Sequence, residues 1–588
     1  MFDAVLIANR GEIAIRIARA CRELGVRAVG VYSEVDRDAP HVHAMDDAYL
    51  LGPTPASESY LAIPKVIEVA QRAGVDAIHP GYGFLAENAD FAQAVADAGF
   101  TFVGPPPAAI AAMGDKLSAR AVADAAGVPV VPGTREPTDD AEVAIAFGDE
   151  YGYPVAVKAM FGGGGRGMKV VHDASQMVEA LEAAQREAKA AFGRGECYLE
   201  RYLERPRHVE IQVLADLDGT TIYLGERDCS LQRRHQKLVE EAPAPGMTPE
   251  LRAAMGEAAC GVAKQMGYTN AGTCEFLLDE DGETFYFLEM NTRLQVEHPV
   301  TELITGVDLA QAQLKIAAGD GMGLTQDDVE LRGHAIEVRI NAEEPALGFV
   351  PTPGSIGELV APLGPWVRFD TGVRSGYSVP RDYDSMIGKL IVWASDRDGA
   401  RARMSRALDE LVIDGLPTTV PFHRLAMTHP QFAAGEHATS SVEREWDLSS
   451  LEPQPIGGAP DDDGDGAGRE VTVEVDGRRL AVRLFGDLPA ASAAPAPAAR
   501  KRRRGGDGGG SLAAVSGEDL TAPMQGTVVK VTVELGAVVV EGDTLLILEA
   551  MKMENAVKAH RAGTVTALPV SAGEVVQPGA VLARIEDV

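Results

Sequence analysis

A run of alternating polar residues in the middle of the chain carries groups that could move a proton. In the stretch "LEMNTRLQVEHPVTE", every second position is polar, at Glu289, Asn291, Arg293, Gln295 and Glu297. Alternate residues of an extended segment share one face. A carboxylate among cations can take up and release a proton, and a fixed guanidinium stabilises a developing oxyanion. The pattern therefore predicts a functional face rather than core packing.

A second carboxylate precedes this run. The stretch "AGTCEFLLDEDGETFYFLEMN" predicts two strands joined by a loop centred on Gly282, and a loop of about five residues would place Glu275 directly opposite Glu289. Two adjacent carboxylates repel each other unless a cation lies between them. Carboxylate oxygens favour Mg²⁺ over zinc, especially near a phosphate site such as the one that the glycine run of this sequence would form. Two exposed strand glutamates without a metal are the alternative.

A glycine run points to phosphate binding. "FGGGGRGMKV" follows the predicted strand "YPVAVKA" and contains Gly163, Gly164 and Gly165, whose backbone amides could approach phosphate oxygens closely. The run lacks the P-loop pattern, so a flexible loop without a ligand is the alternative. Lys158 on the preceding strand and Lys116 in "MGDKLSAR" could supply positive charge.

A basic cluster lies between residues 226 and 245, in "ERDCSLQRRHQKLVEEAPAP". It is either a basic surface loop or a cradle for an anion, formed by Gln232, Arg233, Arg234, His235 and Lys237. We interpret Cys229, inside this cluster, as a packing thiol.

These groups must be positioned by alternating strands and helices. From residue 1 to about 446, apolar β-like runs alternate with amphipathic helical segments, which predicts an α/β architecture with a parallel sheet in the first hundred residues. The composition of residues 447–515 predicts a linker that contains a hairpin at 470–485, with its turn at Asp476-Gly477. The basic run 501–504 is interpreted as part of a solvated tether rather than a nucleic-acid arm.

The last part of the chain is an internal repeat. Residues 526–549 align with 563–586 at an offset of 37, with ten of the 24 positions identical. Two such halves predict a small β-sandwich with quasi-twofold symmetry. The joining segment "EAMKMEN" would display Lys552 at a turn.

This repeat resembles the biotinyl carrier domain of biotin-dependent carboxylases. The motif "AMKM" carries the resemblance, and Met551 and Met553 favour biotin over lipoate. The resemblance implies that Lys552 forms an amide with biotin, the covalent cofactor.

Residues 1–446 resemble the ATP-grasp biotin carboxylase family through "HPGYGFLAEN", "GGGGRGM", "RPRHVEIQVLAD", "ERDCSLQRRHQK" and "EMNTRLQVEHPVTE". The expected fold is multidomain α/β: an ATP-grasp biotin carboxylase with an N-terminal Rossmann-like subdomain, a flexible linker and a small all-β biotinyl (lipoyl-like) domain. The expected boundaries are 1–114 for the N-terminal α/β subdomain, 115–330 for the ATP-grasp region with a mobile lid at about 130–203, 331–446 for the C-terminal subdomain and 516–588 for the carrier domain.

The resemblance also implies residue roles. ATP phosphates or ribose would contact Lys116, Lys158, His208, Gln232, His235 and the glycine run, and the adenine would contact Glu200 and Leu203. Two Mg²⁺ or Mn²⁺ ions would be held by Glu275, Glu289 and Asn291. Bicarbonate would be held by Lys237, Arg293, Gln295 and the amide of Val296, with Glu297 as the general base. Arg339 would stabilise the biotin enolate and Tyr82 would help to seat biotin.

Three interpretations remain open at this point. The first is the α subunit of a bacterial acetyl-/propionyl-CoA type carboxylase, or of a methylcrotonyl-CoA or other acyl-CoA carboxylase. The second is another ATP-grasp ligase of the carbamoyl-phosphate type, and the third is a carrier with an inert ATP-grasp half. The first implies a separate carboxyltransferase β subunit, because no second large domain follows, together with a biotin protein ligase and possible small accessory subunit. It also implies pairing of biotin carboxylase domains through the helix that holds Arg16, Arg19 and Glu23.

Composition limits the partners and the compartment. The 588 residues carry a formal charge of −33, which opposes nucleic-acid binding. The five cysteines form no CxxC pair, which is typical of a reducing compartment. No signal peptide or membrane-length apolar run is evident, so we expect a cytoplasmic protein with no membrane partner.

Overall fold

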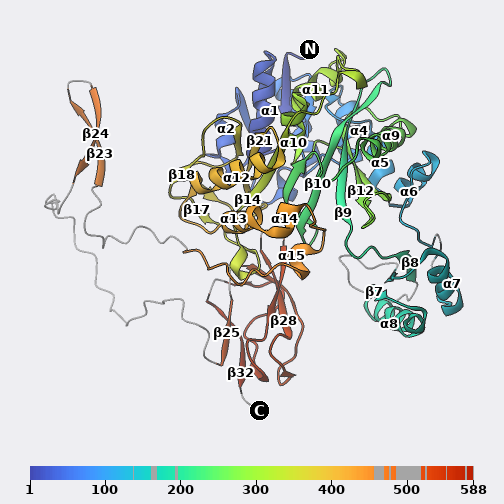
Figure 1. Cartoon of the computed structure of the whole chain (residues 1–588). Helices are drawn as coiled ribbons and strands as arrows, with labels where there is room; N and C mark the ends of the chain where they lie inside the picture. Colours follow the sequence, from blue (N-terminus) through green and yellow to red (C-terminus); the bar gives the residue numbers. More distant parts are fainter. Residues whose placement is uncertain are drawn as a thin grey trace, which may run out of the picture. The chain divides into compact units, whose positions relative to one another are not determined.

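The computed structural model divides into two compact units, Met1–Gln454 and Pro455–Val588 (Figure 1). It describes all residues except 115, 135, 137, 160–167, 193–196, 456–468, 476–477, 485–517, 523–525, 551–552, 577–578 and 587–588. Among the helices of the described residues, none combines the length and the apolar character needed to cross a bilayer.

The first hundred residues form the expected parallel sheet, with strand order β3-β2-β1-β4-β5. Its strands are β1 (Ala4–Ile7), β2 (Arg27–Ser33), β3 (Asp47–Gly52), β4 (Ala77–His79) and β5 (Thr101–Phe102). Both faces are apolar, as a covered parallel sheet requires: Val5 and Ile7 join one core cluster, and Leu6 and Ile78 join another. The helices of this region are α1 (Gly11–Glu23), α2 (Pro40–His43), α3 (Ile63–Ala73), α4 (Ala89–Asp97) and α5 (Pro107–Gly114).

A second, eight-stranded sheet forms the centre of the first unit. Its order is β13-β12-β9-β10-β11-β14-β21-β19, and every neighbouring pair is antiparallel. The strands are β9 (Arg207–Ala215), β10 (Thr221–Arg233), β11 (Gln236–Ala242), β12 (Asn270–Leu278), β13 (Phe285–Asn291), β14 (His334–Asn341), β19 (Val367–Thr371) and β21 (Met386–Ala394).

This sheet has one apolar and one polar face. Val209, Ile211 and Val213 of β9 belong to a core cluster that includes Ala259 and Val262 of α9 (Pro249–Gln265). The intervening side chains of β9 are polar although they are buried. Because strand residues alternate between faces, these polar groups lie on the face opposite that cluster.

A small three-stranded sheet, ordered β7-β6-β8, lies within the segment 130–203. It consists of β6 (Val155–Ala159), β7 (Met168–Val171) and β8 (Cys197–Arg201), and it packs with α7 (Ala141–Tyr151) and α8 (Ala174–Phe192) in a core cluster of its own. The mobility of this lid stays a prediction.

The first unit contains further helices and several short strands. The helices are α6 (Lys116–Ala125), α10 (His298–Thr305), α11 (Leu309–Ala317), α12 (Arg397–Glu410), α13 (Val420–Thr428), α14 (Pro430–Ala434) and α15 (Ser441–Arg444). The short strands are β15 (Glu343–Glu344), β16 (Val350–Pro351), β17 (Gly354–Ser355), β18 (Leu359–Val360), β20 (Ser378–Val379) and β22 (Val412–Ile413).

The second unit contains a hairpin and a sandwich. β23 (Arg469–Val475) pairs with β24 (Arg478–Leu484) at the position where the sequence predicts a hairpin. The sandwich has two four-stranded sheets, β25-β32-β30-β27 and β29-β28-β26-β31. Its strands are β25 (Asp519–Thr521), β26 (Gly526–Val531), β27 (Val538–Val539), β28 (Thr544–Ala550), β29 (Met553–Lys558), β30 (Gly563–Ala567), β31 (Val575–Val576) and β32 (Val581–Glu586).

The sequence repeat is a structural repeat. Residues 37 positions apart occupy the same core cluster, in the pairs Val528 and Val565, Val539 and Val576, Leu545 and Leu582, and Leu548 and Ile585. Ala550 pairs with Met553, so residues 551–552 connect β28 to β29. Lys552 itself lies outside the described residues.

Candidate active site

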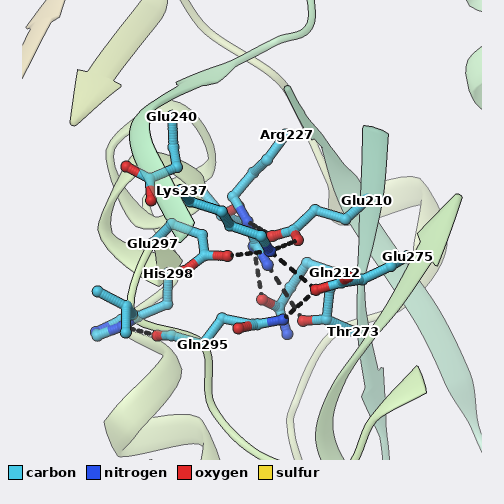
Figure 2. Close-up of polar contacts among 12 residues, drawn as sticks. Glu210, Gln212, Arg227, Lys237, Glu240, Thr273, Glu275, Gln295, Glu297 and His298 are labelled. Carbon is cyan, nitrogen blue, oxygen red and sulfur yellow. Dashed lines mark hydrogen bonds and ion pairs between the residues drawn. The ribbon is translucent and has the colours of Figure 1, made fainter. Parts of the chain in front are cut away.

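Lys237 is the centre of the polar face of the eight-stranded sheet (Figure 2). Its ammonium group donates to three carboxylates: Glu210 at 2.6 Å, Glu275 at 2.9 Å and Glu297 at 2.6 Å. Burial opposes its charge, but these carboxylates raise the pKa of Lys237 well above its ordinary value. The residue is therefore a fixed cation that gathers acids from β9, β12 and the start of α10.

Glu297 is the N-cap residue of α10 and is fully buried. One carboxylate oxygen accepts from Lys237, and the other accepts from Arg339 of β14 at 2.9 Å. Burial would raise the pKa of Glu297, but Lys237, Arg339 and Arg227 hold it well below its ordinary value. The group is thus ionised and able to accept a proton.

The residues before Glu297 converge on Glu275. The side-chain amides of Asn291 and Gln295 donate to Glu275 Oε1 at 2.9 Å and 3.0 Å. Arg293 donates to Asn291 at 3.0 Å and to Gln295 at 2.8 Å. Four of the five alternating residues, counting Glu297 through Lys237, therefore join one network.

The prediction of one continuous extended run is nevertheless wrong in its local structure. β13 ends at Asn291, and Glu297 lies in the turn that begins α10. Pro299 at the start of this helix and the hydrogen bond from the His298 backbone N–H to Gln295 O favour the turn. The residues converge because the chain bends, not because it stays extended.

Glu275 and Glu289 are direct cross-strand partners, as predicted. The reason differs from the predicted one: Leu278 pairs with Phe285, leaving six loop residues, and a bulge between the pairs at Glu275 and Phe276 restores the register. Glu289 is exposed, whereas Glu275 is buried and its pKa lies well below the ordinary value because Lys237 and His208 outweigh burial.

A divalent cation fits this corner of the site. His208 Nε2 lies 3.0 Å from Glu275 Oε2, and ligand atoms of His208, Glu210 and Glu275 all lie within 4.8 Å of one another. Buried carboxylate oxygens next to an exposed glutamate are the donors that Mg²⁺ and Mn²⁺ prefer.

The predicted nucleotide-binding residues are partly assembled. Lys158 of β6 forms an ion pair with Glu200 of β8. Leu203 belongs to a small apolar cluster with Val131 and Tyr286. The Gln232 side-chain Nε2 lies 3.4 Å from His208 Nδ1. His235, in contrast, is exposed in the turn between β10 and β11. The side chain of Lys116 and residues Gly163, Gly164 and Gly165 lie outside the described part of the chain.

The three remaining predicted residues, Arg339, Tyr82 and Val296, also form specific polar contacts. Arg339 Nε donates to Glu240 at 2.6 Å, in addition to its contact with Glu297. Tyr82 follows β4 and donates its hydroxyl to Glu12 of α1. The backbone carbonyl of Val296 accepts from Lys389 of β21 at 2.5 Å.

Sequence reasoning missed several buried charges. Arg227 is fully buried and donates to Glu210 at 2.5 Å, to Gln212 at 2.8 Å and to Thr301 at 2.9 Å. The signal that could have found this part of the site is the alternation in "RHVEIQVLA", where His208, Glu210 and Gln212 interrupt an apolar strand. The same alternation places Glu337 and Arg339 in "HAIEVRIN".

Comparison with protein families covers nearly the whole chain. The matched families are "Biotin carboxylase, N-terminal domain" over residues 1–110, "Carbamoyl-phosphate synthase L chain, ATP binding domain" over 115–325, "Biotin carboxylase C-terminal domain" over 337–444 and "Biotin-requiring enzyme" over 518–585. The flanking biotin carboxylase domains separate this chain from a carbamoyl-phosphate ligase that shares only the central domain.

Two individual relatives support the same family assignment. The biotin-dependent acyl-coenzyme A carboxylase alpha3 subunit of Mycobacterium leprae is 50% identical over 594 residues, covering 99% of this chain and 98% of the relative. Biotin carboxylase 1 of Bacillus subtilis is 52% identical over 443 residues, covering 75% of this chain and 98% of the relative.

A solved structure shares the fold of the first unit. The biotin carboxylase domain dimer of the Hydrogenobacter thermophilus 2-oxoglutarate carboxylase, in complex with MgADP, ADP and bicarbonate, has a TM-score of 0.68 and 47% identity, covering 75% of this chain and 97% of that one. The ATP-grasp carboxylase fold and the C-terminal biotinyl fold are thereby confirmed. The chain belongs to the family of biotin-dependent acyl-coenzyme A carboxylase alpha subunits, which are ligases that combine biotin carboxylase activity with a biotin carrier domain.

Proposed function

We propose that this chain carboxylates biotin carried on its own Lys552, using ATP and bicarbonate through carboxyphosphate. The observation that supports this most is the position of Glu297, an ionised carboxylate held between Lys237 and Arg339. A base with one cation on each oxygen is suited to an anionic substrate that must lose a proton.

Bicarbonate would bind against Lys237, Arg293, Gln295 and the amide of Val296. Glu297 takes the bicarbonate proton as the resulting oxyanion attacks the γ-phosphorus of ATP, and ADP leaves as the phosphorus–oxygen bond to it breaks. Lys237 then offsets the negative charge that builds on the carboxyl group. Preformed donors of this kind stabilise charge without reorganising during the reaction.

Nucleotide and metal would bind beside this pocket. Lys116, Lys158, His208, Gln232, His235 and the glycines 163–165 would contact the phosphates or ribose, and Glu200 with Leu203 would contact the adenine. Glu275, Glu289 and Asn291 would hold Mg²⁺ or Mn²⁺, which when bound supplies positive charge to the phosphate oxygens. The ion pair between Lys158 and Glu200 must rearrange for both to serve ATP.

Tyr82 would help to hold biotin, and Arg339 would stabilise negative charge on its ureido group. When attached to Lys552, biotin supplies the nitrogen that accepts the carboxyl group. The register of β28 and β29 supports this role, because Ala550 pairs with Met553 and Lys552 is one of the two residues between them in the sequence.

The acceptor of the carboxyl group would be an acyl-CoA bound by a separate carboxyltransferase β subunit, with acetyl-CoA or propionyl-CoA as the first candidates and methylcrotonyl-CoA as the alternative. The full-length match to an acyl-CoA carboxylase alpha subunit supports this assignment. A biotin protein ligase would attach the biotin, and a small accessory subunit could complete the complex.

Self-association would use the first unit, as in the dimeric domain of the relative. Within α1, Arg16 is buried against Glu302 and Asp308, whereas Arg19 is 55% exposed. Arg19 is therefore the better candidate for a contact between copies.

The experiment that tests the proposal uses the chain purified with its partner. It is incubated with ATP, Mg²⁺ and labelled bicarbonate and then chased with acetyl-, propionyl- and methylcrotonyl-CoA, alongside Lys552→Arg. Label on the wild-type chain only, moving to one thioester, is the expected result. Absence of label on a chain that mass spectrometry shows to be biotinylated would overturn the proposal.

The hairpin β23–β24 would be a reduced docking element for the β subunit. Deleting residues 469–484 should abolish co-purification of the partner and leave bicarbonate-dependent ATP hydrolysis intact. Unchanged co-purification would contradict this assignment.

A further inference from the structure

A buried chain of contacts runs from Tyr82 to the peptide that joins Val296 to Glu297. The Tyr82 hydroxyl donates to Glu12 Oε1, and the Lys389 ammonium lies 3.2 Å from the same oxygen. Lys389 also donates to the carbonyl oxygen of Val296 at 2.5 Å. The first and third links are hydrogen bonds and the second is an ion pair, and the bond from the Lys389 ammonium to the Val296 carbonyl is charge-assisted.

Both connecting side chains are removed from solvent. The Lys389 side chain is 0% exposed and that of Glu12 is 2% exposed. A buried ion pair stabilises a fold poorly compared with apolar residues of similar volume, because both charges lose their hydration. A contribution to stability is therefore a poor explanation for the buried pair of Lys389 and Glu12, which points to another role.

The fold holds both ends of this chain firmly. Lys389 lies directly opposite Arg339 on one neighbouring strand and directly opposite Asp370 on the other. The Tyr82 end is fixed by Asn9, whose side-chain amide donates to the Pro80 and Tyr82 carbonyls at 2.7 Å each. The ammonium group of Lys389 also lies 5.9 Å from the centre of the Tyr82 ring.

We infer that Lys389 and Glu12 are positioning residues that couple the Tyr82 hydroxyl to the Val296–Glu297 peptide. This inference rests on the proposed function, in which Tyr82 seats biotin and Glu297 acts on bicarbonate. Lys389 fixes the plane of the peptide that begins Glu297, and Glu12 determines how far Lys389 can reach toward it. Displacement of the Tyr82 hydroxyl therefore changes the position of the Val296–Glu297 peptide in the proposed bicarbonate pocket through the two positioning residues.

The test is a double-mutant cycle on the KM for bicarbonate, measured by ATP hydrolysis with the biotinylated full chain. Lys389→Met should raise this KM about tenfold, and Tyr82→Phe about threefold, with the KM for ATP changed less than twofold in each. In the Lys389→Met background, Tyr82→Phe should have no further effect on the KM for bicarbonate, because the connection is already cut. Equal effects of Tyr82→Phe in both backgrounds would overturn the inference.

A second variant covers the case in which Lys389→Met does not fold. Glu12→Gln keeps an acceptor for Tyr82 and removes the charge that orients Lys389, so it should raise the KM for bicarbonate about threefold. An unchanged KM for bicarbonate in Glu12→Gln would also overturn the inference.

The matched control is Arg252→Met, which breaks another ion pair to a fully buried carboxylate, with Glu226 at 2.6 Å. It should lower the melting temperature and leave the KM for bicarbonate unchanged, which separates positioning from a general loss of stability. The proposed function is checked in the same series: wild-type hydrolysis that does not depend on bicarbonate would overturn that proposal itself, whereas normal bicarbonate dependence with unshifted variants overturns only the coupling.

Discussion

Glu240 on β11 lies directly opposite Glu337 on β14, and neither carboxyl group is exposed to solvent. Burial raises the pKa of both groups, to about 7 for Glu240, even though Arg339 acts in the opposite direction. Two facing carboxyl groups in such a place cannot easily both ionise.

This pair predicts a pH-dependent stability. Between the ordinary pKa of a glutamate and about 7, the folded chain holds a proton that the unfolded chain has lost, so the free energy of unfolding falls as the pH rises through this range. Glu240→Gln should remove about 1–3 kcal/mol of that fall. Melting temperatures of both proteins at roughly pH 5.5 and pH 8, on either side of the pKa of about 7, provide the measurement. An equal fall in melting temperature for wild type and Glu240→Gln between the two pH values would contradict this prediction.

Replacing Lys237 should affect activity and stability together. Lys237→Met leaves three buried carboxylates without their shared cation, which we expect to cost about 3–5 kcal/mol of stability. Bicarbonate-dependent ATP hydrolysis should fall by roughly 10²–10³-fold. The control Lys264→Met removes an exposed lysine of α9 and should change stability by less than about 0.5 kcal/mol. Activity of Lys237→Met within tenfold of wild type would argue against its role.

The two glutamates that are proposed to hold the metal, Glu275 and Glu289, should respond differently to substitution. Glu289 is exposed, so Glu289→Gln should weaken Mn²⁺ binding in the presence of an ATP analogue by about tenfold or more while leaving the melting temperature unchanged. Glu275→Gln should weaken Mn²⁺ binding and also lower the melting temperature, because Glu275 accepts from Lys237, Asn291 and Gln295. Electron paramagnetic resonance of free Mn²⁺ measures both affinities. Equal Mn²⁺ affinity in wild type and Glu289→Gln would remove Glu289 from the metal site.

Gly372 should be intolerant of even one added methyl group. A Cβ at this position would lie 2.8 Å from the backbone nitrogen of Glu12, at the start of α1. Gly372→Ala should therefore cost about 1–3 kcal/mol and raise the KM for bicarbonate through displacement of Glu12. Gly261→Ala in α9 is the control, because its Cβ would meet its nearest neighbour at 3.9 Å and alanine favours the helix. Similar melting temperatures for the two variants would contradict the close approach.

The sequence predicted most of this architecture where a pattern was periodic. The parallel sheet followed from the alternation of strands and helices, and the repeat followed from self-similarity at an offset of 37. The pairing of Glu275 with Glu289 was predicted correctly from a loop of about five residues, but it arises from a longer loop and a bulge. The bulge in β13 was not predictable, because a one-residue insertion leaves no signal in the composition of the strand.

The buried part of the site was harder to predict. Arg227 and Lys389 are fully buried charges, and nothing in their local sequence distinguishes them from charges on a solvated strand face. Their burial results from contacts distant in sequence: Arg227 reaches Thr301, and Lys389 reaches Val296. Local sequence reasoning therefore identifies polar residues in a repeating pattern more readily than buried charges whose partners are distant in the sequence.

The two units each complete a hydrophobic core from their own residues, and the sandwich does so from two copies of one pattern that repeats after 37 residues. A gene encoding such a chain can be divided or fused between these units during evolution without leaving either product half folded. The reaction then requires only that both products meet. Inheritance of the carboxylase and its carrier as one polypeptide fixes their ratio at one to one, which separate genes would have to achieve by matched expression.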